Sequence, residues 1–443
     1  MSQEAIRIGR RGVLAGLGAT AVVAGLSACG NGGNEPAGTA SPAASGSAGK
    51  AGGERGPITY ATGKDTTGKL QTFLDKWNAA HPDEKVTLIE LPESADEQRN
   101  QMVQNAQAKS DAFTVLGLDV VWTAEFAANK WIMELPKDKF KLDDFLKATV
   151  DTSTYYDKLY AVPFTTNGQL LFSRKDLLEE AGFANPPKTF EEMYKMIDAV
   201  KAKHPEMKGF GSQFFKYEGL TCQMTGAAKS SGTELFGSDG KPQVDKEGPV
   251  KALQTLKEGF DKGYMPKEAL TYKEEESRQA FQDGGLIFVQ NWPYVWEKFE
   301  ATDGSSKVNG KVVASVVPGI GGAGSTTVGG LNLGISAFAK NKDTAMDFIA
   351  FLTAPEQQKE WHLETSNPAA RTSVYSDADL KKKYDFLDTL KTAVDTGASR
   401  PKAVRYPAVS QAIQDAAYKT ISGEGDAAAA MKDLQAKLTE LTK

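Results

Sequence analysis

The stretch from Tyr160 to Val200 constrains the fold more than any other part of this 443-residue chain. It begins with an apolar run that ends in the polar sequence TTNG (165–168), and a second apolar run follows. Two helical patterns come next, separated by a Pro-Pro turn, and Thr189 begins the second helix. The order strand, crossover, strand, helix, with polar side chains at the crossing, predicts a hinge between two lobes whose cleft holds a small polar molecule.

The chain after residue 56 alternates between the periodicities of strands and helices. Its first part has the order β-α-β-α-β, which predicts a mostly parallel sheet covered by helices, and Asp119 lies inside the third, otherwise apolar strand. From Val200 to Leu286 the pattern is mainly helical. The predicted strands are 57–62, 86–91, 115–122, 286–289, 312–317 and 331–338, and the predicted helices are 69–80, 96–109, 343–353, one from Pro355, 406–422 and 427–441.

The N-terminus predicts an export signal. Three arginines precede an uncharged stretch, 12–28, that is too short to span a membrane comfortably. The stretch ends in Leu-Ser-Ala-Cys, which resembles a bacterial lipobox and predicts removal of residues 1–28 and lipidation of Cys29. An ordinary signal peptide with an incidental cysteine is the alternative. The pair Arg10-Arg11 resembles a twin-arginine signal, and both the twin-arginine and the general export route stay open.

Composition predicts a tether and excludes several kinds of site. Residues 29–56 are rich in Gly, Ala, Ser and Pro, so we expect a flexible linker between a lipid anchor and a globular body. With Cys29 lipidated, Cys222 has no partner for a disulfide. Three histidines and two cysteines disfavour a metal site, and a net charge of −5 disfavours nucleic-acid binding. We expect no cofactor.

Four segments, spread over the chain, resemble segments of one protein family and so restrict the possible functions. They are SRKDLLEEAGFANPPKTFEEM (173–193), FQDGGLIFVQNWPYVW (281–296), SAFAKNKDTAMDFIAFLTAPEQQ (336–358) and RPKAVRYPAVSQAIQDA (400–416). Together, and in this order, they resemble the extracellular solute-binding proteins of bacterial ABC importers, of the carbohydrate type. The segment DVVWTAEFAANKW (119–131) is similar to the trehalose- and maltose-binding branch of that family.

The resemblance implies a periplasmic-binding-protein-like fold: α/β, with two lobes joined by multiple crossovers and a ligand cleft between them. By this analogy, residues 57–165 and 330–378 form lobe 1, and residues 166–329 and 379–443 form lobe 2. The implied partners are a disaccharide or oligosaccharide, the permease subunits of an ABC importer with a cytoplasmic ATPase, and the membrane through the lipid anchor. We expect a monomer, anchored on the extracytoplasmic face of the cell membrane.

A sugar presents hydroxyl groups at its edge and C–H patches on its faces, so its site needs paired hydrogen-bonding groups and aromatic rings. The resemblance implies an aromatic platform at Trp292 and Tyr294 and a ligand contact at Asp119. One carboxylate of the run Glu274–Glu276 is expected to reach the cleft, and the sequence does not distinguish which. The ligand-binding residues that we predict are Asp65, Thr66, Glu93, Arg99, Asp119, Asn167, Trp292, Tyr294, Gly329, Gly330 and Arg400.

These residues also have structural roles that the sequence leaves open. The alternatives are helix capping for Asp65, Thr66 and Asp119, turn formation for Asn167, a charge pair between Glu93 and Arg99 on a solvated helix, a core position for Trp292, a hinge turn at Gly329-Gly330 and a surface salt bridge for Arg400.

The sequence favours a receptor over an enzyme. It contains no Gly-x-Ser-x-Gly elbow, HExxH motif or P-loop, and we predict no catalytic residues. A secreted, lipid-anchored glycoside hydrolase with two carboxylates across the scissile bond is the main alternative, and a lipid-anchored adhesin or sensor is a third. The anchor and the importer motifs, which catalysis does not require, favour a receptor that captures an α-glucoside such as maltose, trehalose or maltodextrin and delivers it to a permease.

Overall fold

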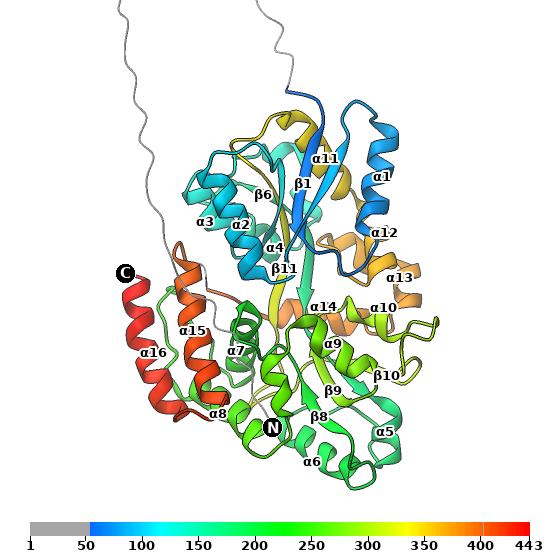
Figure 1. The fold of residues 1–443 in the computed structure, drawn as a ribbon, viewed down its shortest axis with the longest axis vertical. Coiled ribbons are helices and arrows are strands. Elements are labelled where there is room, and N and C mark those ends of the chain that lie inside the picture. Colours follow the sequence, from blue (N-terminus) through cyan, green and yellow to red (C-terminus); the bar gives the residue numbers. More distant parts are fainter. Residues whose placement is uncertain (1–53, 402) are drawn as a thin grey trace, which may run out of the picture. The chain divides into compact units, whose positions relative to one another are not determined.

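The structure is a computed structural model that describes residues 54–401 and 403–443. Its strands form two larger sheets, and each sheet lies among its own helices (Figure 1). The predicted signal peptide 1–28, the predicted lipidation site Cys29 and the predicted linker as far as residue 53 lie outside the described residues. Within the described ranges, no helix is long and apolar enough to cross a membrane.

The first sheet contains the three parallel strands that the β-α-β-α-β order predicts. β1 pairs in parallel with β2 on one side and with β3 on the other. β11 runs antiparallel to both β3 and β6 and parallel to β12, so the complete sheet is mixed. The strands of this sheet are β1 (Ile58–Gly63), β2 (Val86–Leu91), β3 (Val115–Asp119), β6 (Ala161–Gly168), β11 (Thr327–Ile335) and β12 (Ala398–Ser399).

Amphipathic helices cover the first sheet. Leu70, Phe73, Leu74 and Trp77, the apolar face predicted for α1, are all buried. The rings of Trp77 and Phe348 pack edge to face in this core, with centroids 5.5 Å apart. The helices around this sheet are α1 (Leu70–Ala80), α2 (Ala95–Gln107), α3 (Thr123–Ala128), α4 (Lys147–Thr152), α11 (Lys342–Leu352) and α12 (Pro355–Thr365). A hairpin of β4 (Thr154–Tyr155) and β5 (Lys158–Leu159) and the 3-10 helices Lys137–Lys139 and Leu142–Asp144 complete this part.

The second sheet has four strands in the order β10-β7-β9-β8, and its main core contains residues of α7, α8, α15 and α16. The strands are β7 (Leu170–Arg174), β8 (Lys208–Gly211), β9 (Leu286–Asn291) and β10 (Val312–Ser315). The remaining helices are α5 (Lys175–Glu180), α6 (Phe190–Lys201), α7 (Glu218–Ser230), α8 (Glu247–Asp261), α9 (Glu274–Gln282), α10 (Val295–Phe299), α13 (Ala378–Lys383), α14 (Leu387–Thr396), α15 (Tyr406–Ile421) and α16 (Ala427–Leu441), with the 3-10 helices Lys267–Thr271 and Thr372–Ser376.

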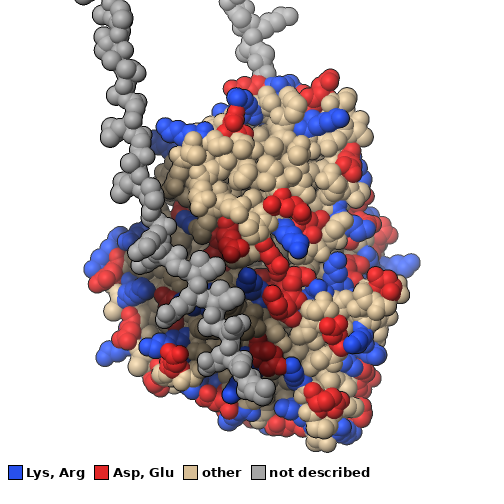
Figure 2. All heavy atoms as spheres, in the orientation of Figure 1, with Lys and Arg blue, Asp and Glu red and all other residues tan. Residues whose placement is uncertain are grey.

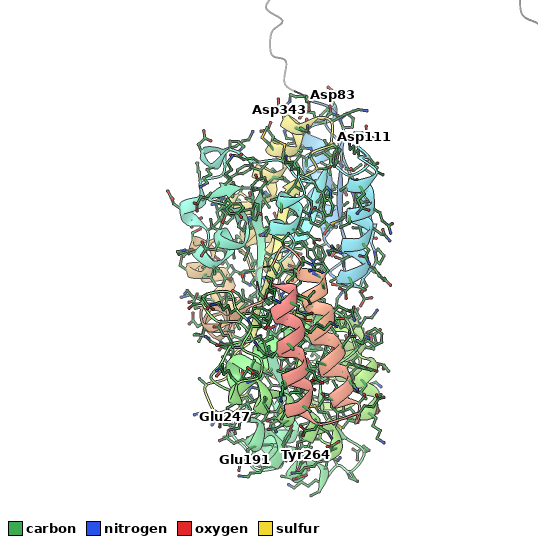
Figure 3. All side chains as sticks on the ribbon, turned by 90° about the vertical axis from the view of Figure 1, so that its left-hand side faces the viewer. Asp83, Asp111, Glu191, Glu247, Tyr264 and Asp343 are labelled. Atoms are coloured by element: carbon green, nitrogen blue, oxygen red, sulfur yellow. The ribbon has the colours of Figure 1, made fainter. Side chains whose placement is uncertain are left out.

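The two sheets lie toward opposite ends of the long axis of the described chain. Figure 3 shows Asp83, Asp111 and Asp343 at one end and Glu191, Glu247 and Tyr264 at the other.

The crossover predicted at TTNG (165–168) lies slightly later, at Gln169, because TTNG is still part of β6 of the first sheet and β7 of the second begins at Leu170. Gln169 is fully buried, and its amide is held by three other glutamines. Its Nε2 donates to Gln213 at 2.5 Å, and its Oε1 accepts from Gln223 at 3.1 Å and from Gln290 at 2.9 Å. Because these amides satisfy one another, the crossing has one fixed position relative to the second sheet.

Three predicted elements differ from the structure. The third strand ends at Asp119 and not at residue 122, because a turn there leads directly into α3. The strand predicted at 331–338 begins at Thr327, inside the glycine-rich segment, because β3 and β6 hold its backbone from both sides. The mainly helical region before Leu286 contains β8, whose four residues include two glycines and give little strand signal.

The lobe boundaries at 165/166, 329/330 and 378/379 stay a prediction. β6 continues to Gly168 and β11 begins at Thr327, so both strands of the first sheet cross the predicted boundaries.

Glycine is required at position 330 of β11. Its φ is 143°, and a Cβ there would lie 2.3 Å from the carbonyl oxygen of Thr165. We expect Gly330→Ala to lower the free energy of unfolding by about 2–4 kcal/mol, as measured by urea denaturation. Gly182→Ala is the matched control, because Gly182 also has a positive φ of 88° but has open space around its Cβ position. We expect a loss of about 1 kcal/mol there; equal losses in both variants would contradict the close approach at Gly330.

Candidate ligand-binding site

The carboxyl ends of β1, β2 and β3 lie at one edge of the first sheet, where ligands of α/β proteins commonly bind. The loop after β1 contributes Asp65 and Thr66 to a cavity of about 160 Å³ that Leu331 and Asn367 also line. The carboxylate of Asp65 accepts from the backbone N–H of Leu70 at 2.8 Å, at the start of α1. Asp65 therefore has the capping role that the sequence left open. Thr66 also lines the cavity and does not cap α1.

Asn167, Gly329 and Trp292 come together although they are far apart in the sequence. Asn167 and Gly329 are direct partners in the β6–β11 ladder. A Cβ on Gly329 would lie 3.0 Å from Cη2 of Trp292 and 3.7 Å from the Cβ of Asn167. The Oδ1 atom of Asn167 is sheltered from solvent and has no hydrogen-bond partner among the described residues. A buried amide oxygen without a donor, beside a half-buried indole ring, is what a donor-rich ligand with an apolar face requires.

Carboxylates from both parts of the fold face this group. Burial raises the pKa of Glu93, in the loop after β2, and the charges of Glu276 and Glu275 raise it further. Burial raises the pKa of Glu274, at the start of α9, to about 7, and the charge of Glu93 adds to the increase, while the Tyr217 and Trp292 side chains partly oppose it. Figure 2 shows acidic side chains gathered across the middle of the drawn face.

Glu274 is the member of the acidic run that interacts with Trp292. Glu275 accepts from the Tyr294 hydroxyl at 2.6 Å and from Nε of Arg278 at 2.7 Å. Glu276 accepts from the backbone N–H of Lys273 at 3.0 Å and so caps α9. A hydrogen bond from the Trp292 side chain favours the charged form of Glu274 and so lowers its pKa, against the effect of burial.

Two predicted residues are used elsewhere. Tyr294 is only 8% exposed, and its ring packs into a core cluster while its hydroxyl binds Glu275. Arg99 binds Glu125, with Nε 2.8 Å from Oε2, so the charge pair between Arg99 and Glu93 is wrong. The physical reason is that Glu93 lies in the loop before α2, whereas Arg99 lies in the second turn of α2 and contacts the buried Glu125 of α3.

Arg400 is buried and not a surface residue, which corrects the surface salt bridge considered for it. Its Nη2 and Nη1 atoms lie 2.5 and 3.1 Å from the two carboxylate oxygens of Asp119. Its Nη1 atom also donates to Oε1 of Glu218 at 2.7 Å. Asp119, the last residue of β3, thus lies next to a guanidinium. Gly330 is close to this pair, because the carbonyl oxygen of Gly330 accepts a hydrogen bond from the N–H of Val120 at 3.3 Å.

Sequence reasoning missed Glu218, which begins α7. Its carboxylate accepts from the hydroxyls of Tyr406 and Ser410 as well as from Arg400. Burial raises the pKa of Glu218, and the charge of Arg400 opposes this increase. Tyr406 and Ser410 lie in the segment 400–416 that carries the family resemblance, but no local pattern indicates their partner.

The described residues contain no group of three or more His, Cys, Asp and Glu side chains placed to hold a metal ion. Cys222 is buried in α7.

Comparisons with known proteins identify the family. A model of the bacterial extracellular solute-binding proteins matches residues 72–387. The chain belongs to this family. A probable ABC transporter-binding protein of Deinococcus radiodurans is 30% identical over 378 residues, which cover 83% of this chain and 89% of that protein. The predicted family is confirmed.

Solved structures give the fold of this solute-binding protein. Maltose-bound MalE3 of T. maritima is 32% identical, with a TM-score of 0.83, and the match covers 87% of this chain and 99% of that one. A solute-binding protein of Agrobacterium radiobacter in complex with ribitol is 24% identical, with a TM-score of 0.77, over 87% of this chain and 98% of that one. The predicted two-lobe α/β fold is confirmed.

The raised pKa of Glu274 predicts a pH dependence of stability. Its pKa is about 7 in the folded chain against an ordinary value of 4.5, so the folded state holds more protons than the unfolded state between these values. The stability that comes from holding this proton is fully present below about pH 4.5 and is lost as pH rises through about 7. The free energy of unfolding therefore falls across this window.

Glu274→Gln removes the titrating group, so the free energy of unfolding should decrease less with pH in this variant than in the parent. Urea denaturation at about pH 5 and about pH 8 measures this difference. The exposed Glu440 supplies the control Glu440→Gln. An unchanged pH slope in the Glu274 variant would show that this carboxylate is not held in a desolvated place.

Proposed function

We propose that this chain is the substrate-binding protein of a carbohydrate ABC importer and that it captures an α-glucoside such as maltose, trehalose or a maltodextrin. The observation that carries the proposal is the group of Trp292, Gly329 and the unpartnered amide oxygen of Asn167, with Glu93 and Glu274 facing it. The indole ring suits the C–H face of a sugar, and the oxygen acceptors suit its hydroxyl groups. The maltose bound by the T. maritima relative supports the narrower choice of an α-glucoside.

The proposal keeps part of the predicted set as ligand contacts and gives the other members supporting roles. Asp119 and Arg400 bind each other and so hold the end of β3. Asn167, Trp292, Glu93 and Thr66 are proposed to touch the sugar directly. Gly329 and Gly330 allow the backbone and the indole ring to approach closely. Asp65, Arg99 and Tyr294 hold the surrounding loops and helices through the contacts described above.

The mechanism that we propose is a shift of population between open and closed arrangements of the two lobes. Glu93 lies on the first-sheet side, whereas Glu274 and Trp292 lie on the second-sheet side. A ligand that donates hydrogen bonds to both sides binds the closed arrangement better and therefore increases its population. Its hydroxyl groups also donate hydrogen bonds to two carboxylates that otherwise repel each other.

The proposal includes the cellular setting. Cys29 carries a lipid, residues 29–56 tether the lobes to the extracytoplasmic face of the cell membrane, and export follows the twin-arginine or the general route. The closed monomer then meets permease subunits that work with a cytoplasmic ATPase.

Trp292→Ala tests the proposed platform. We expect it to weaken maltose binding at least tenfold, or about 1.4 kcal/mol, in isothermal titration calorimetry. Trp131→Ala is the control, because Trp131 packs edge to face on Phe126 near α3 and is not part of the group. An unchanged affinity of the Trp292 variant would remove this residue from the site.

A sugar panel tests the ligand class and the hydrolase alternative in one experiment. We expect maltose, trehalose or maltotriose to raise the melting temperature in proportion to the logarithm of its concentration, and ribitol to have a smaller effect, because a ligand that binds only the folded state stabilises it by mass action. The same samples are assayed for glucose after prolonged incubation, and none is expected. Glucose release that depends on the protein would favour a glycoside hydrolase instead.

A further inference from the structure

One contact in the structure joins two helices that belong to different cores. Met102 of α2 is buried in one core cluster with Leu116 and Leu118 of the first sheet. Leu220 and Met224 of α7 belong to the core cluster of the second sheet. The N-terminal ends of these two helices meet, so this contact spans the two lobes.

The meeting point is a hydrogen bond from one helix to the backbone of the other. Oδ2 of Asp96, in the first turn of α2, accepts from the backbone N–H of Glu218 at 3.0 Å. Glu218 is the first residue of α7, where backbone N–H groups have no partner within the helix. A carboxylate at this position also interacts favourably with the positive end of the helix dipole. Asp96 thus caps a helix of the opposite lobe.

The side chain of Glu218 holds that helix end in place. It is 5% exposed, and its carboxylate is bound by Arg400, Tyr406 and Ser410. Arg400 lies in the connection from β12 to α15, and its other partner is Asp119 at the end of β3. Residues of both lobes therefore depend on the position of Glu218.

The cluster holds three carboxylates, from Asp96, Asp119 and Glu218. Arg400 binds Asp119 and Glu218. The positive charge that acts on Asp96 is instead that of Arg99, which is itself bound to Glu125. A half-buried carboxylate loses part of its hydration, and the partial positive charge at the start of α7 offsets part of that loss for Asp96. Separation of the lobes would return Asp96 to water and leave the α7 N-terminus open.

We propose that Asp96 and the N-terminus of α7 form a latch between the lobes, and that Glu218 is the positioning residue that sets its geometry through Arg400. This inference rests on the proposed function and adds how closure is regulated. The latch makes part of the closed arrangement independent of ligand contacts, so it raises the closed population before the sugar binds. The apparent affinity then increases with that population.

The test compares unliganded proteins by small-angle X-ray scattering, in full chains that carry Cys29→Ser so that no lipid is attached. We expect Asp96→Ala to have a larger radius of gyration than the parent. Asp96→Asn should be intermediate, because its amide oxygen still accepts the hydrogen bond but lacks the charge. Glu97→Ala is the matched control, since Glu97 is the neighbouring acidic residue in the same first turn of α2 and is exposed; it should match the parent.

Affinity supplies a second readout. Maltose binding by calorimetry should weaken about threefold to tenfold in Asp96→Ala and in Glu218→Gln. The double variant should lose no more than the larger single loss, because both residues act through one contact. Equal radii for Asp96→Ala, Glu97→Ala and the parent would overturn the latch. Additive losses of affinity would overturn the positioning role of Glu218. The unliganded scattering decides the latch even when maltose is not the ligand, so its failure is distinct from failure of the proposed function.

Discussion

The burial of Arg400 is the constraint on which the arrangement around the cleft depends. A guanidinium that is 4% exposed must be paired, and its partners come from the end of β3 and from the first turn of α7. The chain supplies Arg400 from the connection between the first sheet and α15. Three distant segments are consequently fixed by one side chain, and the proposed latch and ligand contacts lie around it.

The candidate site combines groups that are poorly satisfied without a ligand. Asn167 has an amide oxygen without a donor, and Glu93 and Glu274 are carboxylates whose pKa values are raised by burial. Such groups lower the stability of the unliganded protein. The contact between Asp96 and α7 acts in the opposite direction. A receptor needs a balance of these two effects. The closed arrangement must be only partly populated without ligand, and the binding energy of the ligand must be enough to make it the main state.

Sequence patterns predicted the elements better than the contacts between them. The apolar face of α1, the first three strands and the crossover after TTNG follow from local periodicity, and the structure has them. Trp292 was predicted through the family resemblance and Asn167 from the polar step at the crossing, and both lie next to Gly329. The bond between Asp96 and Glu218 could not be predicted, because it joins residues 122 positions apart and depends on how two cores are placed. Tyr294 illustrates the same limit, since the core cluster that buries its ring includes Leu170 and Phe172, which are distant in sequence.

The crossing at Gln169 has a consequence for how the protein responds to its surroundings. The cluster that holds it consists of amides from Gln169, Gln213, Gln223 and Gln290, which neither gain nor lose a proton in the pH range where proteins are folded. Burial raises the pKa values of Glu93, Asp96 and Glu274, by contrast. We therefore expect acidification of the medium to change the contacts of these carboxylates, while the crossing at Gln169 keeps the same chemistry.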